Sequence, residues 1–242
     1  MPTAQIISAF DDSGRHNRDL QATVKRLERN KSYKDLSTIV LIPSRGMISA
    51  RIVVSWMHLM RPPNNKTTEM IVQGVEVGDA YSTAIENILA HPDLGQWKYI
   101  LCMEEDNSPP GDGLLRLLER MEAHPEFSAI GGLYFTKGEG GVAQIWGDPN
   151  TTPLNFRPQK PDPDGGLVEC CGTGMGFTLF RSEMFKDERL RRPWFRTVAN
   201  AQEGCYTQDL YAWSDFRKHG HRCAIDCSVR VGHLDVETGI MW

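Results

Sequence analysis

The sequence predicts an α/β fold in which a mainly parallel sheet is flanked by helices. Short apolar or β-branched runs alternate along the chain with segments whose apolar residues recur at helical spacing. This order is typical of parallel strands joined by crossover helices. In addition, the apolar run at 97–103 stops abruptly at three consecutive acids, as expected of a buried strand whose carboxyl end meets solvent. We therefore expect ligands at that edge of the sheet.

The first elements follow from the spacing of apolar residues. Residues 38–42 are β-branched or apolar and predict a strand, and the Pro-Ser-Arg-Gly sequence after them predicts a turn. The next helix carries apolar residues at positions 48, 52, 56 and 59, and a second strand lies near 70–72. A second helix spans roughly 79–89, with its apolar positions at 80, 84, 85 and 88, and it leads to the acid-terminated strand.

The alternation continues through the middle of the chain. Asp112 is placed to cap a helix whose apolar residues recur at i, i+3, i+4 and i+7, and a strand near 129–135 follows. Residues 138–166 are rich in Gly, Pro and Asp and predict a long surface loop, of a length that is usually functional or disordered. The glycine-spaced segment 172–176 then leads into a strand. Its glycines allow close approach of a ligand, of another backbone, or simply a tight bend.

Two elements close the chain. Thr207 and Gly220 have the residue types of a helix cap and a left-handed helix stop, and Leu210, Trp213 and Phe216 between them face inward. The strand that follows alternates from 222 to 233. We expect one of its faces to consist of the residues Cys223, Ile225, Cys227, Val229 and Val231. The two thiols are therefore predicted to be core side chains rather than zinc ligands with the nearby His219 and His221.

Composition and charge limit the classes of function. The 242 residues, 40% of them hydrophobic, suffice for one well-buried domain, which we assign to 38–242. Residues 1–37 are predicted to be a polar appendage with a short helix around Leu20, Val24 and Leu27. A net charge of −4 and a pI near 6.0 give no general attraction to nucleic acid or to anionic membranes.

The expected location is the cytoplasm. No stretch of the sequence reaches the length of a membrane span, and the amino terminus is not of the signal-peptide type, so we expect a soluble intracellular protein. The six cysteines are irregularly spaced in a chain that is large enough to need no disulfides, and we expect them to be thiols.

The acid triplet is the strongest functional signal. In an extended chain, alternation puts Glu104 and Asp106 on one side and Glu105 on the other. Two carboxylates with this spacing suit Mg²⁺ or Mn²⁺ that carries a substrate diphosphate. The alternative is a solvated acidic turn, closed by Asn107 and the Pro-Pro pair.

Two later residues are candidates for the same site. Asp209 falls in the first turn of a predicted helix, where the helix dipole favours the ionised carboxylate that a base or a hydroxyl-orienting group requires. A plain dipole-complementing aspartate is the alternative. His233 ends the last strand and could supply a third ligand to a metal held by the acids, although a histidine at such a position is commonly just an exposed side chain.

The order of these motifs resembles that of the GT-A glycosyltransferases, the nucleotide-sugar-dependent enzymes of the family-2-like superfamily. The resemblance covers roughly residues 38 to 235 and implies a Rossmann-like GT-A fold. It also implies that 38–135 is the nucleotide-sugar-binding half of the domain and 136–242 the acceptor half. Glu104 and Asp106 stand where the family has its Asp-any-Asp motif, which binds the divalent ion and the donor diphosphate. Asp209 matches the second acid of a Glu-Asp helix motif, with Gln208 in place of the Glu, and His233 matches a late metal-binding histidine.

The resemblance also implies roles for the remaining site residues. The donor would be a nucleoside-diphosphate sugar, with a UDP-sugar as the first choice, and Mn²⁺ or Mg²⁺ as cofactor. Asp209 would be the catalytic base in an inverting reaction or would hold the acceptor in a retaining one. The donor-site residues would be Ser44, Arg45 and Asp79 near the base and ribose, with Glu104, Glu105 and Asp106 near the diphosphate. The acceptor-site residues would be Gly174, Trp194, Phe195 and Gln208, although an aromatic pair after a proline is as often a packing anchor.

The acceptor and two rival functions stay open at this point. Five cations between 186 and 196 are interleaved with aromatic residues, so a nucleic-acid acceptor such as a hydroxylated base is admissible beside a glycan or a protein, and a solvated charged loop is the plainer description. A sugar nucleotidyltransferase would share the sheet and the acids, but the turn at 43–46 is too short for a triphosphate loop. A catalytically inactive binding module that retains the fold is the alternative from another class.

Overall fold

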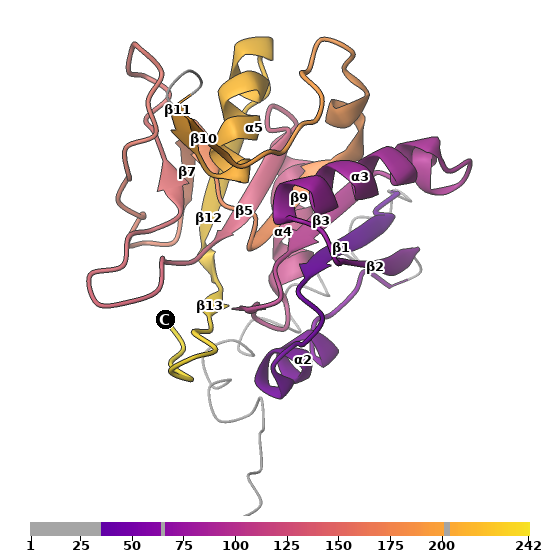
Figure 1. Ribbon diagram of the computed structural model, residues 1–242, viewed down its shortest axis with the longest axis vertical. Helices are drawn as coiled ribbons and strands as arrows, with labels where there is room; N and C mark the ends of the chain where they lie inside the picture. Colours follow the sequence, from indigo (N-terminus) through magenta and orange to yellow (C-terminus); the bar gives the residue numbers. More distant parts are fainter. Residues whose placement is uncertain (1–34, 64–65, 201–203) are drawn as a thin grey trace, which may run out of the picture.

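The computed structural model describes residues 35–63, 66–200 and 204–242, and Figure 1 shows them as one sheet with helices packed against it. Seven strands form the central sheet in the order β2-β1-β3-β9-β5-β12-β7. Their bounds are Thr38–Ser44 (β1), Thr67–Gln73 (β2), Tyr99–Met103 (β3), Ala129–Leu133 (β5), Leu167–Cys170 (β7), Phe177–Arg181 (β9) and Cys223–Arg230 (β12). The helices are Ala50–Met57 (α2), Val77–Ala90 (α3), Gly113–Ala123 (α4) and Gln208–Phe216 (α5), with 3₁₀ turns at Leu94–Gln96 (η2), Ser182–Lys186 (η3) and Arg217–His219 (η4).

The sheet is mostly parallel, as the sequence predicts. Strand β1 runs parallel to both β2 and β3, and β12 runs parallel to β5. Strand β9 lies antiparallel between β3 and β5, and β7 is antiparallel to β12 at the edge. Five of the seven strands therefore share one direction. Because β9 comes from the second half of the chain and lies between two strands of the first, residues 38–135 and 136–242 are interleaved within one sheet.

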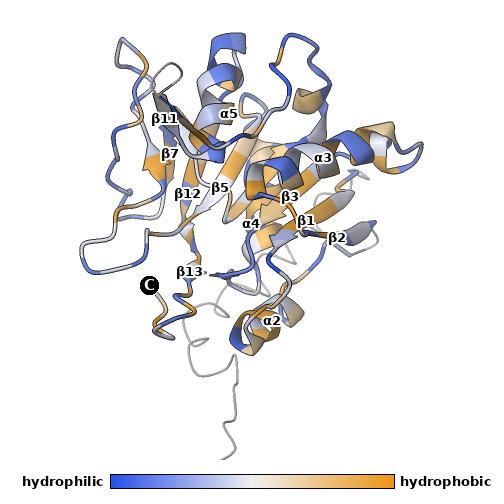
Figure 2. Cartoon of the chain, viewed as in Figure 1, coloured by the Kyte–Doolittle hydropathy of each residue, from blue (hydrophilic) through white to orange (hydrophobic). Residues whose placement is uncertain are grey.

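A hydrophobic core lies on each face of the sheet, and Figure 2 shows the apolar strands between the amphipathic helices. Strand β3 contributes to both cores, because Ile100 and Cys102 face one side and Tyr99, Leu101 and Met103 face the other. Helices α3 and α5 cover the first face and α4 covers the second. This burial on both sides explains why the run before the acids is apolar at every position.

The last strand departs from the predicted alternation. Cys223, Ile225 and Cys227 lie in one core, but Val229 and Val231 lie in the opposite one. The pairing of β12 with β5 shifts register between Asp226 and Arg230, and the extra residues of this β-bulge exchange the two faces. The prediction that all five residues share a face is therefore wrong beyond the bulge. The two thiols themselves are core side chains, as predicted.

The bulge brings the end of the chain to the acid motif. After it, Gly232–His233 (β13) pairs antiparallel with Asn107–Ser108 (β4), with His233 opposite Asn107. Four further short strands form two antiparallel pairs, Ile145–Trp146 (β6) with Gly172–Thr173 (β8) and Val198–Asn200 (β10) with Gly204–Tyr206 (β11). Much of 138–166 is loop, as predicted.

The start of the domain lies slightly earlier than predicted. Leu36 is buried in a core, and the carbonyl of Ser37 accepts a hydrogen bond from the Tyr99 backbone N–H at 3.0 Å. Both residues thus belong to the folded unit rather than to the appendage. The helix predicted around Leu20 lies outside the described residues. Within the described part of the chain, no helix combines the length and the apolar composition that crossing a bilayer requires.

Candidate active site

The acid motif follows β3 directly, at the carboxyl end of a strand next to the middle of the sheet. The backbone N–H of Glu104 donates to the carbonyl of Gly176 at 3.2 Å, and the N–H of Asn107 donates back to the carbonyl of Glu104 at 3.1 Å. The three carboxylates are therefore presented on a tight turn between β3 and β4. Each of them has a different environment.

Glu105 is directed toward the turn after β1. Its carboxylate accepts hydrogen bonds from the Ser44 hydroxyl at 2.7 Å and from the Arg45 backbone N–H at 2.9 Å, and it forms an ion pair with the Arg45 guanidinium. Burial acts to raise the pKa of Glu105, but these hydrogen bonds outweigh it and lower the pKa below its usual value. Ser44 and Arg45 are thus the partners of this carboxylate in the structure, and the expected contact of Glu105 with a donor stays a prediction. The role of Glu105 in the structure is to hold the Ser44–Arg45 turn.

Asp106 lies between two basic side chains. Its Oδ2 is 2.6 Å from the Lys137 Nζ and 3.6 Å from the His233 Nε2. Burial acts to raise the pKa of Asp106, and the contacts with His233 and Lys137 outweigh it and lower the pKa to about 2. Asp106 is thus a carboxylate at any physiological pH.

His233 has the orientation of a metal-binding histidine. Its Nδ1 lies 2.8 Å from the carbonyl oxygen of Phe135, which can only accept, so Nδ1 carries the proton. The Tyr134 ring packs edge-on against the imidazole at a centroid distance of 5.5 Å. With Nδ1 bonded to the Phe135 carbonyl, Nε2 is the ring nitrogen that faces Asp106, in the arrangement in which a backbone carbonyl fixes the ring orientation of a metal ligand.

Glu104 forms the interior part of the site. Its side chain is partly accessible, and the hydroxyl of the buried Tyr81 lies 3.5 Å from its Oε1. Burial raises the pKa of Glu104 to about 8, with further contributions from the charges of Asp106 and Asp209. Glu104 and the two aspartates therefore share one electrostatic environment, although 105 residues separate Glu104 from Asp209 in the sequence.

Asp209 is buried in the first turn of α5. Its Oδ1 accepts hydrogen bonds from the Thr207 hydroxyl and from the Leu210 backbone N–H, the latter at 2.9 Å. Burial raises the pKa of Asp209, and these hydrogen bonds act in the opposite direction. The predicted cap is thus altered, because the Thr207 hydroxyl donates to Asp209 and makes no capping bond to the helix backbone. Gln208, next to it, is half-buried.

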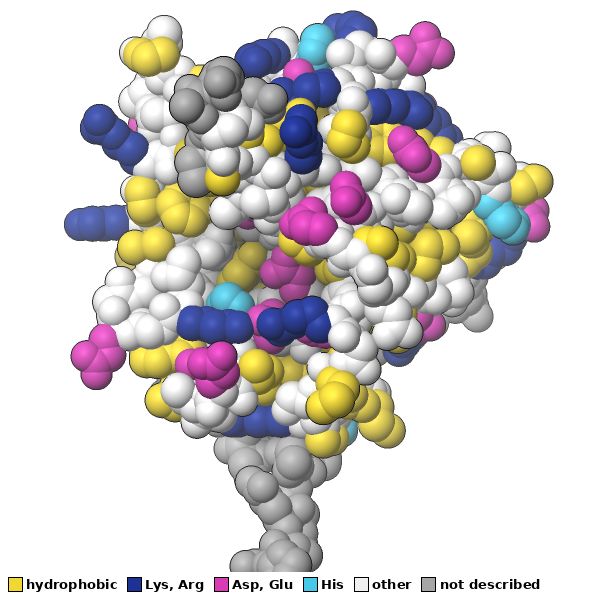
Figure 3. All heavy atoms as spheres, viewed as in Figure 1, with side chains coloured by type: hydrophobic (Ala, Val, Ile, Leu, Met, Phe, Trp, Pro, Cys, Tyr) yellow, Lys and Arg dark blue, Asp and Glu magenta, His cyan; other side chains and the backbone are white. Residues whose placement is uncertain are grey.

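These groups surround a recess. Figure 3 shows a hollow on this face with acidic side chains in its depth, a histidine at its edge and basic side chains in front of it. Among the residues described, no three His, Cys, Asp or Glu side chains are already set as a metal shell. The donor set nevertheless fits a divalent ion, because the Asp106 carboxylate and the oriented His233 imidazole converge, with Glu104 beside them.

The two other predicted donor residues differ in their placement. The Arg45 side chain is 73% exposed beyond its ion pair, so it is accessible at the carboxyl edge of β1. Asp79 is exposed in the first turn of α3, whose N-terminus is capped by the Glu76 carboxylate. No hydrogen bond or ion pair within the described ranges joins Asp79 to the acids.

The predicted acceptor aromatics are core residues. Trp194 is 1% exposed and Phe195 is fully buried, and both rings pack against Phe185. The expectation that they lie against an acceptor is therefore corrected in favour of the packing anchor. A Cβ on Gly174 would lie 2.1 Å from the Tyr134 hydroxyl, so the close approach that this glycine allows is to a side chain of the protein.

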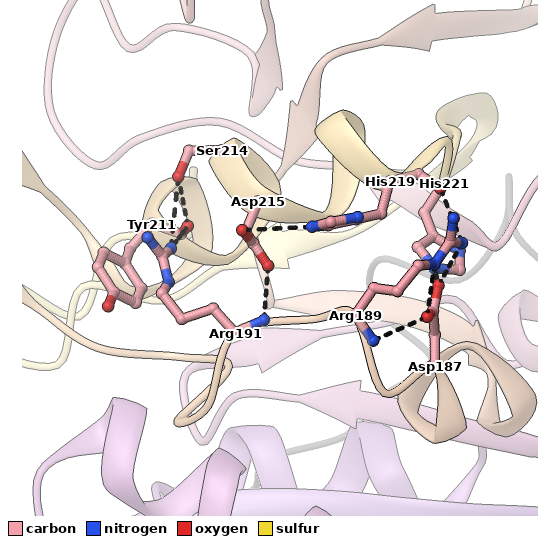
Figure 4. A network of polar contacts seen from close by, with 8 residues as sticks. All are labelled: Asp187, Arg189, Arg191, Tyr211, Ser214, Asp215, His219 and His221. Carbon is pink, nitrogen blue, oxygen red and sulfur yellow. Dashed lines mark hydrogen bonds and ion pairs between the residues drawn. The ribbon is translucent and has the colours of Figure 1, made fainter.

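The basic segment before these aromatics is occupied by contacts within the protein, as Figure 4 shows. Arg189 forms an ion pair with Asp187 at 2.7 Å. Arg191 lies over the Tyr211 ring at 3.5 Å, and its backbone N–H donates to the Asp215 carboxylate at 2.8 Å. The Arg191 contacts join the segment to α5, whereas the Arg189 side chain stays 66% exposed beside Asp187.

Sequence reasoning missed Lys137 and Tyr134. Both follow β5, which lies two strands from β3 in the sheet and runs in the same direction, so they lie at the same carboxyl edge as the acids. The rule that ligands lie at the carboxyl ends of parallel strands identified the acid motif, and it identifies Tyr134 and Lys137 as well when it is applied to the predicted strand near 129–135. Tyr134 is buried, and its hydroxyl accepts the Gly176 backbone N–H at 2.9 Å.

Comparisons with known proteins bear on the fold. No family model matches the sequence, and no curated protein is detectably similar to it. The crystal structure of A197 from STIV is similar with a TM-score of 0.59 and 16% sequence identity, over 83% of this chain and 87% of that one. At this identity, the likeness concerns the fold alone.

Proposed function

We propose that this chain is a metal-dependent GT-A glycosyltransferase that moves a sugar from a nucleoside-diphosphate sugar to a hydroxyl acceptor. The observation that carries the proposal is the convergence of Glu104, Asp106, Asp209 and His233 in one recess from three separate segments. The fold of the sheet, with ligand-type residues after β1, β3 and β5, is compatible with this class.

The donor diphosphate is proposed to lie beside Asp106 and His233. These two residues, with Glu104 next to them, would hold Mn²⁺ or Mg²⁺, which supplies charge stabilisation to the departing nucleoside diphosphate. Arg45 and Ser44, held in place by Glu105, would face the nucleotide, for which uridine is the first choice.

Asp209 is proposed to receive or orient the acceptor hydroxyl. Its Oδ1 is used by Thr207 and Leu210, so Oδ2 is the oxygen that the acceptor would meet. A carboxylate whose pKa is raised by burial is a stronger base near neutral pH than an exposed aspartate. In an inverting reaction Asp209 takes the proton of the hydroxyl, and in a retaining reaction it holds the acceptor.

The test is release of nucleoside diphosphate from a panel of UDP-, GDP- and TDP-sugars in the presence of Mn²⁺. We expect EDTA and Asp106→Asn to abolish release, and Asp209→Asn to reduce it by about 10²- to 10⁴-fold. Asp164→Asn, at an exposed turn, is the matched control and should leave the rate unchanged. Release that is insensitive to EDTA and to Asp106→Asn would contradict the proposal.

One observation favours a second candidate, the inactive binding module. Asp106 is already in an ion pair with Lys137, and Glu104, with a pKa of about 8, carries a proton at neutral pH. A module of this kind would bind nucleotide without turnover, so absence of release across the whole panel would select it. Release of pyrophosphate from a nucleoside triphosphate would instead indicate a sugar nucleotidyltransferase.

A further inference from the structure

Lys137 lies where a divalent ion would approach Asp106. Its Nζ is 2.6 Å from Oδ2, and the His233 Nε2 is 3.6 Å from the same oxygen. Divalent ions of the proposed kind bind carboxylate oxygens at about 2.0–2.2 Å. An ammonium and such an ion repel each other, so both cannot contact one oxygen at these distances. Binding of the metal therefore requires Lys137 to leave.

The position of Lys137 allows it to leave. It lies on a turn after β5 that is closed by the Thr136 N–H donating to the Val142 carbonyl at 2.9 Å. Its side chain is 31% exposed, and a lysine stem can move its ammonium by rotation alone. Besides its contact with Asp106, the positive charge of Lys137 also acts to lower the pKa of the Glu104 and Asp235 carboxyl groups. The Lys137 ammonium is thus held at the edge of the recess by its contact with Asp106 and by the negative charges of the nearby carboxylates.

The ion pair of Arg45, at the same edge of the sheet, differs from that of Lys137. Its partner Glu105 is buried and also holds the Ser44 hydroxyl and the Arg45 backbone N–H, so this ion pair is part of the architecture of the turn. The partner of Lys137 has no comparable set of backbone donors. Of Arg45 and Lys137, Lys137 is therefore the one whose contact competes with a ligand.

We propose that Lys137 is an internal cation that neutralises Asp106 until a divalent ion replaces it, and that the released ammonium then pairs with the donor diphosphate. This inference rests on the proposed function. A nucleotide-sugar diphosphate brings negative charge to the recess, and further charge develops on it as the sugar departs. The released Lys137 lies beside that charge, so the same residue opposes metal binding and favours diphosphate binding.

The experiment measures binding of Mn²⁺ alone, by electron paramagnetic resonance of the free ion, and then of UDP at saturating Mn²⁺, by calorimetry. We expect Lys137→Met to bind Mn²⁺ about three- to tenfold more tightly than the wild type, because no ion pair has to be broken. The same variant should bind UDP about three- to tenfold more weakly. Lys137→Arg should keep wild-type behaviour in both titrations.

Lys160→Met is the matched control, since it removes an exposed lysine from the long loop and should change neither affinity. Equal Mn²⁺ affinities in wild type and Lys137→Met would overturn the inference, and turnover of the sugar panel would then still support the proposed function. A loss of both affinities in Lys137→Met would indicate a structural role and would also overturn it. A wild type that binds no Mn²⁺ at pH 8 would defeat the metal site itself, and the inference with it.

Discussion

Glu104 and Glu105 are adjacent in sequence, but the fold gives their carboxyl groups opposite environments. Glu105 is stabilised as an anion by donors from the turn after β1, whereas the partly accessible Glu104 lies in the field of two other acids. Alternation along the strand predicts that the two point to opposite sides. It does not predict which side has the hydrogen-bond donors, because those come from residues 60 positions away.

The raised pKa of Glu104 predicts a specific pH dependence of stability. The folded pKa of about 8 lies above the unfolded value near 4.5, so the contribution of Glu104 is fully present below pH 4.5 and is lost as the pH rises to 8. Allowing for its partial exposure, we expect a loss of about 1–2 kcal/mol over this interval. Glu104→Gln should lack this part of the slope, as measured by urea unfolding between pH 5 and 8.

Divalent ions provide the control for this prediction. They bind the ionised carboxylate, so the Mn²⁺ affinity of the wild type should rise between pH 6 and 8. If wild type and Glu104→Gln lose stability in parallel across the interval, Glu104 is not the group that titrates.

At the level of elements, the β-bulge in β12 positions the end of the chain. The buried Asp226 carboxylate accepts from the Ser228 backbone N–H at 2.9 Å, from the Ser228 hydroxyl at 2.6 Å and from Arg120 of α4 at 2.8 Å. These contacts fix the register shift beyond which the chain reaches β13 and His233. The alternating sequence of this strand contains no signal for the bulge, since the hydrogen bonds that stabilise it include one from a distant helix.

We expect Asp226→Asn to destabilise the protein by about 1–3 kcal/mol, because an amide replaces an ion pair and presents a donor to Arg120. The denaturant midpoint measures this, with Asp164→Asn as the exposed control. Midpoints that coincide for the two variants would show that the bulge does not depend on Asp226.

The element predictions that succeeded rest on local periodicity. The strands and helices up to β5 lie where the apolar spacing places them, and the two-sided burial of β3 accounts for its continuous apolar run. The site residues that failed, Trp194 and Phe195, are surface-like in sequence because charged residues surround them. Their burial against Phe185 depends on tertiary packing, which one sequence does not display.

For the whole molecule, the interleaving of the halves predicts cooperative unfolding. Strand β9 hydrogen-bonds to both β3 and β5, so neither 38–135 nor 136–242 retains a complete sheet by itself. We expect far-ultraviolet circular dichroism and tryptophan fluorescence to report one coincident urea transition. Expressed alone, residues 35–135 should lack that transition. Two separated transitions in the full chain would indicate that the halves are independent domains.

The central place of β9 also affects how the protein is made. Chains emerge from the ribosome amino terminus first, at about 5–20 residues per second. Met103 and its partner Phe177 are 74 residues apart, so β3 waits roughly 4–15 s with one unpaired edge before β9 is synthesised. An apolar strand with an open edge can pair with other chains during that interval. The arrangement that brings the acids to the middle of the sheet therefore makes the nascent chain dependent on protection, by chaperones or by the pace of translation, until its second half arrives.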